Sequence, residues 1–412
     1  MPISNKQMQI MAFPYTKYDA IICDGAIRSG KTVFMTLTFI DDAMERYNGQ
    51  RFGICGKTVD SAVKNIIAPY LELSYAKKKY RLQWRRSDKI LVVSRGAKKN
   101  VFEVFGGKDE SSYTLIQGRT LAGVLLDEVA LMPRSFVEQA CARCSVEGSR
   151  LWFNCNPGSP SHWFYQEWIL GAKEKNALHL HFLLEDNPSL AEAVVQRYKN
   201  LYTGVFYQRY ILGVWCVAEG LIYQQFAEDE QRYMIRKEDV PKLSYIEIGA
   251  DVGGNRSNHA YVATGYTAAR DEMYVLKACS YKATGVTVTE YRENLLKFAD
   301  EVKEEYGFVD TIWPDCAEAA IVNEVEAHSP YNVRGCIKEE ILDRVRCADI
   351  LFSQDRIKIV EGQCDDLCAG LRTAVWDEKN DDKPLDDGSY DRDIIDAFDY
   401  SMTPHIAYLV RG

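Results

Sequence analysis

The chain has 412 residues, enough for two or more domains, and its 47% hydrophobic and 26% charged residues are typical of a globular protein. It has no apolar run long enough to span a bilayer and its N-terminus is polar, so we expect neither a membrane span nor a signal peptide. A formal net charge of −9 excludes a surface that is basic throughout, although a local basic patch would suffice to bind nucleic acid.

A complete phosphate-binding motif lies near the N-terminus. Residues 25–32 read Gly-Ala-Ile-Arg-Ser-Gly-Lys-Thr, follow an apolar strand at 20–23 and precede a predicted helix at 33–40. Glycines let backbone N–H groups turn toward phosphate oxygens, and the helix N-terminus adds positive potential. The motif predicts that its lysine reaches the phosphates of a nucleoside triphosphate and that its threonine holds Mg²⁺. The predicted nucleotide-binding residues of this loop are Gly25, Arg28, Ser29, Gly30, Lys31 and Thr32.

The rest of the first half alternates strands with helical stretches, as an α/β nucleotide-binding domain does. A helix is predicted at 61–73, and the predicted strands span residues 52–56, 90–94, 101–105, 123–127 and 151–154. Between residues 76 and 100, ten lysines and arginines face one acid, and Tyr80 and Trp84 lie among them. This segment is interpreted either as a DNA-contacting surface or as a solvated surface hairpin.

The strand at 123–127 has the form of a Walker B segment, because it ends in two acids. Asp127 is predicted to bind Mg²⁺ through water, and Glu128 to orient and deprotonate the attacking water. Hydrolysis also needs a cation against the charge that develops on the γ-phosphate. Arg28 and Arg119 are the alternatives for this role, and either could instead be an ordinary surface arginine.

Three amide side chains are further candidates at the nucleotide site. Asn154 and Asn156 end the strand at 151–154, where an amide can sense the γ-phosphate, although they could equally form a simple turn. Gln7 precedes the first strand and is predicted either to recognise the adenine edge with two hydrogen bonds or to face solvent.

The second half has a different order of elements. A helical, aromatic stretch at 190–223 is predicted to connect two domains. It is followed by three strands with short turns, a helix at 288–306 and two later strands. The five predicted strands span residues 245–251, 259–266, 272–277, 309–315 and 331–337. Three antiparallel strands followed by a helix and parallel strands predict a ribonuclease H-like sheet.

Carboxylates end two of these predicted strands and recur on a later helix. Asp251 and Asp315 are the strand-end acids, while Asp393 and Asp396 lie three residues apart and therefore on one helix face. Clustered carboxylates repel one another unless cations are present, so the pattern predicts two Mg²⁺ ions that clamp a phosphodiester. Glu318 is a candidate extra ligand. A single strand-end aspartate, by contrast, is often only a turn former.

Two other metal patterns are weaker. The acidic loop at 381–388 does not place oxygen ligands at calcium-loop spacing. Cys141 and Cys144 lack a convincing second ligand pair, although Cys155 and His162 follow, so zinc is not expected there.

Taken in order, these motifs resemble the large terminase subunit of tailed bacteriophages. The resemblance spans nearly the whole chain and is specific in combination. Its motifs lie at residues 25–32, 124–128, 156–157, 213–215, 219–223, 315–318 and 396–400.

The resemblance implies an ATP-driven motor that packages double-stranded viral DNA into a procapsid in the host cell cytoplasm, with an Mg²⁺- or Mn²⁺-dependent endonuclease that cuts concatemers. It also implies a portal protein and a small terminase subunit as partners, and a homo-oligomeric ring on the portal. By the matching motifs, ATP hydrolysis is assigned to Lys31, Thr32, Asp127 and Glu128, and nuclease metals to Asp251, Asp315 and Asp396. The sequence departs from the family pattern twice: Asp393 replaces a frequent histidine, and Asp399 a frequent arginine.

The expected fold is α/β, with an N-terminal P-loop ATPase domain of the ASCE/RecA-like type at 1–200, a connecting segment at 201–240 and a ribonuclease H-like nuclease domain at 241–412. Two other functions stay open. One is a helicase or recombination ATPase with an attached nuclease, and the other is an ATP-dependent assembly factor that does not cut DNA.

Overall fold

The computed structural model describes residues 2–253, 257–317, 319–377, 379–386 and 388–410, and the chain forms two compact units. The first unit comprises Met1–Lys199 and Val205–Val217, and the second comprises Asn200–Gly204 and Ala218–Gly412. The segment at 201–240 therefore contributes residues to both units.

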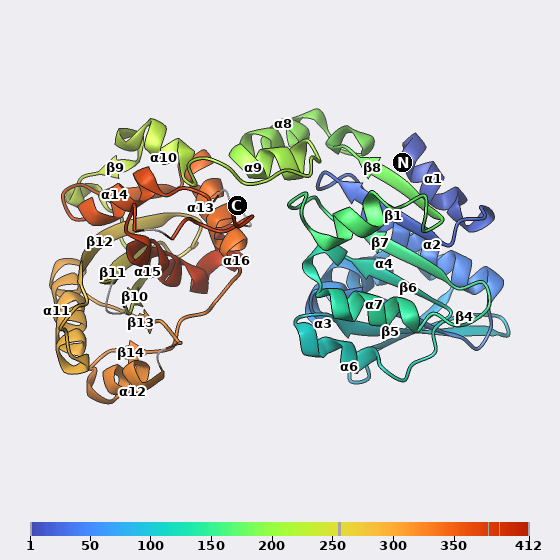
Figure 1. The fold of residues 1–412 in the computed structure, drawn as a ribbon, viewed down its shortest axis with the longest axis horizontal. Helices are drawn as coiled ribbons and strands as arrows, with labels where there is room; N and C mark the ends of the chain where they lie inside the picture. The colour runs from blue at the N-terminus through green and yellow to red at the C-terminus, as the bar shows by residue number, and fades with distance from the viewer. Residues whose placement is uncertain (1, 254–256, 318, 378, 387, 411–412) are drawn as a thin grey trace. The chain divides into compact units, whose positions relative to one another are not determined.

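The first unit is built on one eight-stranded sheet with the order β3-β4-β5-β2-β6-β7-β1-β8 (Figure 1). The strands from β5 to β8 in this order run parallel, whereas β3 and β4 form an antiparallel hairpin at one edge. Because β7 separates β1 from β6, the sheet has the additional central strand of ASCE-type ATPases. The strands are β1 (Ala20–Gly25), β2 (Arg51–Gly56), β3 (Arg81–Arg85), β4 (Ile90–Arg95), β5 (Lys98–Gly106), β6 (Gly123–Asp127), β7 (Arg150–Asn154) and β8 (Ala177–Phe182).

Helices cover both faces of this sheet, and β1 shows why. Ile21 and Cys23 share a core with Phe39 of α2 on one face of the sheet. Ala20 and Ile22 share a core with Phe136 of α7 on the other face. The helices before residue 150 are α1 (Asn5–Ala12), α2 (Lys31–Arg46), α3 (Val59–Ala62), α4 (Ala68–Glu72), α5 (Ser74–Lys79), α6 (Tyr113–Ile116) and α7 (Arg134–Ala142). Two later helices, α8 (Glu192–Leu201) and α9 (Gly204–Phe206), contribute residues to both units.

Two sequence predictions for this unit need correction. The predicted helix at 61–73 is interrupted by a wide π turn at Val63–Ile67, next to Pro69, which has no backbone N–H to continue a regular helix. The helical stretch predicted at 190–223 ends at Ile211, and residues 213–219 have no regular structure.

The second unit contains a seven-stranded sheet with the order β14-β13-β10-β11-β12-β15-β9. An antiparallel meander of β10, β11 and β12 is joined by β13 and β14, which run parallel to β10, as in ribonuclease H-like sheets. Two strands that the sequence did not predict, β15 and β9, extend the sheet beyond β12. The strands are β9 (Met234–Ile235), β10 (Tyr245–Asp251), β11 (Asn258–Tyr266), β12 (Met273–Lys282), β13 (Thr311–Pro314), β14 (Asn332–Val333) and β15 (Ile357–Val360).

Helices α11 and α15 pack on opposite faces of β10. Ile246 and Ile248 share a core with α11, whereas Gly249 faces α15 so closely that a Cβ there would lie 1.9 Å from the carbonyl oxygen of Ala397. Only glycine permits this approach, which brings α15 next to the end of β10. The helices of this unit are α10 (Gln224–Glu228), α11 (Val288–Tyr306), α12 (Ala319–His328), α13 (Ile341–Ser353), α14 (Asp365–Thr373), α15 (Arg392–Met402) and α16 (Ile406–Leu409). Among the described residues, no helix is both long and apolar enough to cross a bilayer.

Candidate active sites

The phosphate-binding loop of the first unit depends on two glycines. Gly25 has φ +117°, and a Cβ there would lie 2.0 Å from the carbonyl oxygen of Phe182. Gly30 has φ +86° and caps the N-terminus of α2, where a Cβ would lie 2.7 Å from Nε2 of Gln7. The loop therefore keeps its shape only with glycine at both positions, and it ends at the positive end of a helix.

Lys31 is 5% exposed and its ammonium group lies inside this loop. Its Nζ donates to the carbonyl oxygens of Gly25 at 3.0 Å and Ala26 at 2.7 Å, and to Oδ1 of Asn156 at 3.3 Å. Burial lowers the pKa of Lys31, since the charged form loses its hydration. The predicted lysine and Asn156 thus lie together.

Asp127 is the last residue of β6 and lies beside Thr32. Both residues are candidate magnesium ligands. The Thr32 hydroxyl donates to Oδ1 of Asp127 at 3.2 Å, and Nδ2 of Asn154 donates to Thr32 Oγ1 at 2.8 Å and also to Asp127. Asn65 donates to Oδ2 of Asp127 at 3.3 Å. Burial raises the pKa of Asp127. A hydroxyl and a carboxylate that meet in this way fit the oxygen ligands that Mg²⁺ requires.

Glu128 follows Asp127 in an uncommon backbone conformation. Its φ of 58° and ψ of 44° lie in the left-handed region, which costs a non-glycine residue of order 1–3 kcal/mol. Strain of this kind persists where the surrounding structure requires a particular direction of the chain. It occurs here at the position that the sequence predicts for the general base.

The other predicted nucleotide-site residues differ in their surroundings. Arg28 is exposed, and its guanidinium lies 5.8 Å from the ring centre of Tyr198. Arg119 is paired with Glu103 in the middle of β5, at 3.4 Å. Gln7 is fully buried and donates to the Ser29 carbonyl oxygen at 3.3 Å, so the alternative that Gln7 faces solvent is wrong. Its proposed contact with adenine stays a prediction.

Sequence reasoning missed a charged cluster directly before the loop. Asp24 is 1% exposed and accepts hydrogen bonds from His179 Nε2 at 2.8 Å, His181 Nδ1 at 3.1 Å and Trp215 Nε1 at 2.7 Å. Burial opposes ionisation of Asp24, but the hydrogen bonds and charges of both histidines outweigh it and lower the pKa. The pair of histidines at alternate positions of β8, which places both on one face of the strand, was the sequence feature that could have indicated this cluster.

In the second unit, the two strand-end acids lie side by side. Strands β10 and β13 are parallel, Ala250 pairs with Pro314, and the backbone N–H of Asp315 donates to the Ala250 carbonyl oxygen at 2.9 Å. Asp251 is 8% exposed. Its pKa is raised to about 8, first by burial and then by the negative charges of the nearby carboxylates Asp396, Asp393 and Asp315. The four predicted acids therefore converge on one region.

Cations that the sequence did not predict offset part of the charge of this acidic group. Arg344 on α13 contacts Asp396 at 3.1 Å and Asp399 at 2.8 Å through its Nη1. Lys338 Nζ lies 2.7 Å from Oδ1 of Asp315. No local motif marks either residue, because each reaches the site from an element distant in sequence.

Asp393 lies at the edge of the acidic group. It accepts a hydrogen bond from the backbone N–H of Asn258 on β11, and its pKa is raised by burial and by neighbouring acids. Glu318, the candidate extra ligand, lies outside the described residues. The position of Asp393 is compatible with either a metal ligand or a residue that holds β11 against α15.

The donor set of Asp251, Asp315 and Asp396 fits a hard divalent cation, because it offers only carboxylate oxygens and carries mutual repulsion that such an ion relieves. Across the described ranges, however, the one group of three ligand atoms within 4.8 Å of one another belongs to Asp315, Cys316 and Cys336. The carboxylate oxygens of Asp251, Asp315 and Asp396 do not all lie within this distance of one another, and Lys338 and Arg344 contact two of these acids separately. Within the same ranges, the cysteines at 141, 144 and 155 form no such group.

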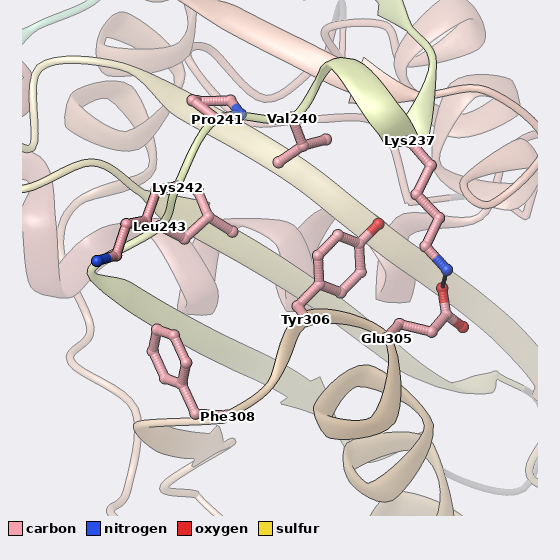
Figure 2. A pocket seen from close by; sticks show the side chains of 8 residues that line it. All are labelled: Lys237, Val240, Pro241, Lys242, Leu243, Glu305, Tyr306 and Phe308. Atoms are coloured by element: carbon pink, nitrogen blue, oxygen red, sulfur yellow. Dashed lines mark hydrogen bonds and ion pairs between the residues drawn. The ribbon is translucent and has the colours of Figure 1, made fainter.

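The second unit also has an open pocket, whose lining side chains are drawn in Figure 2. It has a volume of about 360 Å³ and is lined by Tyr306 and Phe308 together with residues 240–243. Lys237 and Glu305 form an ion pair of 2.7 Å at its rim. None of the predicted acids lines this pocket, so its size alone assigns it no catalytic role.

Comparisons with known proteins identify the family of the chain. The family model described as terminase large subunit, T4likevirus-type, N-terminal, matches residues 22–229. The large terminase of a thermophilic bacteriophage is 37% identical with a TM-score of 0.85, and the match covers 98% of this chain and 99% of that one. The same protein in complex with ADP is matched at 35% identity and a TM-score of 0.83, covering 97% and 99%. No curated protein sequence matches the chain. The chain therefore belongs to the terminase large subunit family.

Proposed function

We propose that the first unit binds and hydrolyses ATP. The observation that carries this proposal is the hydrogen-bonded group of Thr32, Asp127 and Asn154 beside a loop that already encloses Lys31. The related large terminase of the thermophilic bacteriophage, which has been solved with ADP and with ATP-γ-S, supports ATP as the nucleotide.

Each side chain then has a separate role. Lys31 contacts the β- and γ-phosphates, Thr32 and Asp127 hold Mg²⁺, and Glu128 takes a proton from the attacking water. Mg²⁺, when bound, offsets the negative charge of the phosphates. Arg28, which is exposed on the loop, is the proposed cation for the γ-phosphate. The further nucleotide contacts are proposed for Gly25, Ser29, Gly30, Gln7 and Asn156.

The hydrogen bonds of the phosphate-binding loop also suggest how a change in the loop could be transmitted to the rest of the chain. The backbone N–H of Ile27 donates to the carbonyl oxygen of Tyr210 at 2.9 Å, and Trp215 donates to Asp24 directly before the loop. Both partners lie in the segment 205–217, which precedes the main part of the second unit. We infer that a change in the loop on loss of the γ-phosphate is passed to this segment.

The second unit is proposed to be an Mg²⁺- or Mn²⁺-dependent endonuclease. Asp251, Asp315 and Asp396 would hold the metal, with Asp393 as an additional or positioning carboxylate. A divalent metal here polarises the phosphodiester and activates water. Burial and three neighbouring acids keep the pKa of Asp251 near 8, so a cation in this group favours full ionisation of the carboxylates.

Together, these activities support a viral DNA-packaging motor. We propose that the protein moves double-stranded DNA into a procapsid in the host cytoplasm and cuts the concatemer, using a portal protein and a small terminase subunit as partners and working as a ring. The proposed division of labour is ATPase at 1–200, connection at 201–240 and nuclease at 241–412.

The β3–β4 hairpin with the helix before it is the proposed DNA-contacting surface of the first unit. Arg81 and Arg85 are exposed on the same face of β3, and Arg86 and Lys89 are exposed in the turn. In the described part of the chain these four cations have no ion-pair partner, whereas Lys79 pairs with Asp41 at 2.8 Å. Unpaired cations spaced along one edge suit the phosphates of a duplex.

Reversing two of these charges tests the surface. The double change Arg81→Glu and Arg85→Glu should weaken duplex binding and reduce the slope of log affinity against log salt by about one for each phosphate that the variant no longer binds. The matched control is Arg236→Glu, because Arg236 already pairs with Asp239 at 2.8 Å on the second unit. An unchanged salt slope in the double variant would place the DNA-binding surface elsewhere.

Two crossed variants test the two activities. Glu128→Gln should reduce ATP turnover roughly 10²- to 10⁴-fold, leave nucleotide binding intact and leave Mn²⁺-dependent nicking of plasmid DNA unchanged. Asp315→Ala should abolish nicking while ATP turnover persists. Normal turnover in the first variant, or normal nicking in the second, would overturn the corresponding role.

The two competing functions make different predictions. A helicase would separate strands in a directional assay, whereas a packaging motor moves along the duplex without unwinding it. An assembly factor that does not cut DNA would show no metal-dependent nicking. The convergence of acids from two strand ends and a helix favours the cutting enzyme, because simple binding does not require it.

A further inference from the structure

Two thiols lie directly beside Asp315, the acid that directly follows β13. Cys316 is exposed and Cys336 is 6% exposed, and both are free thiols. One carboxylate oxygen of Asp315 and the two sulfur atoms all lie within 4.8 Å of one another. The proposed nuclease has no use for sulfur, because its metals prefer oxygen ligands.

The backbone holds this arrangement in place. The N–H of Cys336 donates to the Pro314 carbonyl oxygen at 2.8 Å, so the chain after β14 continues beside β13. The N–H of Cys316 donates to Sγ of Cys336 at 3.3 Å. A Cβ at Gly335 would lie 3.1 Å from Cβ of Cys316, so glycine allows the two segments to approach closely.

We propose that Asp315, Cys316 and Cys336 form a binding site for a thiophilic divalent cation such as Zn²⁺. Two sulfurs and one carboxylate oxygen are three of the four ligands of a tetrahedral zinc site, and water can supply the fourth. The N–H bond to Cys336 Sγ is the kind of outer contact that orients a metal ligand.

The charges of the group also suit a cation. Two thiolates and a carboxylate carry −3, so a divalent ion leaves −1, and Lys338, 2.7 Å from Oδ1 of Asp315, offsets that remainder. The other oxygen of Asp315 accepts from the Tyr400 hydroxyl at 3.5 Å, a weak contact that a metal can replace. Binding releases one proton from each thiol to solvent, and the cation enters past the exposed Cys316.

The consequence for cutting rests on the function proposed above, in which Asp315 is a nuclease ligand. A thiophilic ion at this site takes Asp315 away from Mg²⁺ or Mn²⁺. Zn²⁺ therefore inhibits DNA cutting through the cysteines, while ATP hydrolysis, which uses the other unit, continues.

The binding site itself is tested with Co²⁺, whose thiolate complexes absorb in the near ultraviolet. The reduced, metal-free full-length protein should develop a sulfur-to-cobalt band that saturates at one equivalent and disappears when Zn²⁺ is added. Cys316→Ser should weaken Co²⁺ binding at least about tenfold and lose the band. Cys279→Ser is the matched control, because Cys279 is a partly exposed thiol on β12 of the same unit. No band in the wild type, or an equal band in Cys316→Ser, would overturn the proposal.

A second arm separates this site from the nuclease assignment. In Mn²⁺, added Zn²⁺ should inhibit nicking by the wild type and by Cys279→Ser, and inhibit Cys316→Ser at least about tenfold less. If the cobalt band forms but no variant cuts DNA, the cation site stands and the nuclease assignment fails. If all three proteins are inhibited equally by Zn²⁺, the link between the cysteines and cutting is wrong.

Discussion

The buried carboxylates of the two candidate sites have different kinds of neighbours. In the first unit, Asp127 is surrounded by neutral donors from Thr32, Asn154 and Asn65. In the second unit, Asp251 is surrounded by other carboxylates, and cations such as Arg344 offset the charge from the outside.

This difference has a physical consequence. Neutral donors can hold Asp127 in place without an ion, so the first site is organised in the absence of a metal. Mutual repulsion between acids cannot do this, so the second site depends on its arginine and lysine partners. The contrast between the sites can be tested by removing each kind of partner.

The largest effect is expected from Arg344→Met. Arg344 is 8% exposed and pairs with both Asp396 and Asp399. Its removal leaves Asp399 without its ion-pair partner and Asp396 with only the more distant Arg392, which should cost about 3–5 kcal/mol in the free energy of unfolding measured with denaturant. Arg392→Met is the control, since Arg392 is more exposed and lies 3.6 Å from Asp396, and its loss should cost less than about 1 kcal/mol.

A second variant identifies the cause of any loss at Arg344. Burial raises the pKa of Asp399 to about 7, and Arg344 opposes that shift. Adding Asp399→Asn to Arg344→Met should therefore recover part of the stability. Equal stability of wild type and Arg344→Met would show that the acidic group does not need this cation.

The next effect concerns pH and is expected from Asp251→Asn. The pKa of Asp251 rises from an ordinary value of 3.8 to about 8 on folding, so between these values the folded state binds more protons than the unfolded chain. The stability of the metal-free wild type should therefore fall as pH rises from about 4 to about 8. Asp251→Asn removes this titration. The variant should have a higher melting temperature than the wild type near pH 8 and nearly the same melting temperature near pH 4.

Metal provides the check on that pH effect. Mn²⁺ should raise the melting temperature of the wild type more than that of Asp251→Asn, because the ion binds only the folded carboxylates. If the difference between the two proteins is the same at both pH limits in a chelator, Asp251 is not repelled by its neighbours as described.

The smallest effect is expected in the first unit, from Trp215→Phe. This change removes one hydrogen bond to the charged Asp24, which keeps its two histidine donors, so the cost should be about 1.5 kcal/mol. ATP binding should persist, while DNA-stimulated ATP turnover should fall, because the loop loses one link to the segment 205–217. Trp163→Phe, a ring outside this hydrogen-bond set, serves as the control, and identical behaviour of both variants would remove Trp215 from the pathway.

Much of the fold was predictable from local patterns. The strand, loop and helix around Lys31, and the meander that begins at Tyr245, follow from apolar runs and turn residues within short windows. Strands β3, β8, β9 and β15 were missed because they are short or lie near sheet edges, where the hydrophobic signal is weak. The π turn at Val63–Ile67 could not be predicted from the sequence, because its hydrogen-bond pattern depends on tertiary packing.

The sequence alone determined which residues end the central strands, and with that the two sets of acids, because parallel strands deliver their carboxyl ends to one edge of a sheet. Only the tertiary structure decided what neutralises them. Asp399, for example, is paired with the guanidinium of Arg344 on α13. Asn65 and Lys338 likewise reach their acids across long stretches of chain. Tertiary packing brings these residues to their acids, and their spacing in the sequence does not indicate the contact.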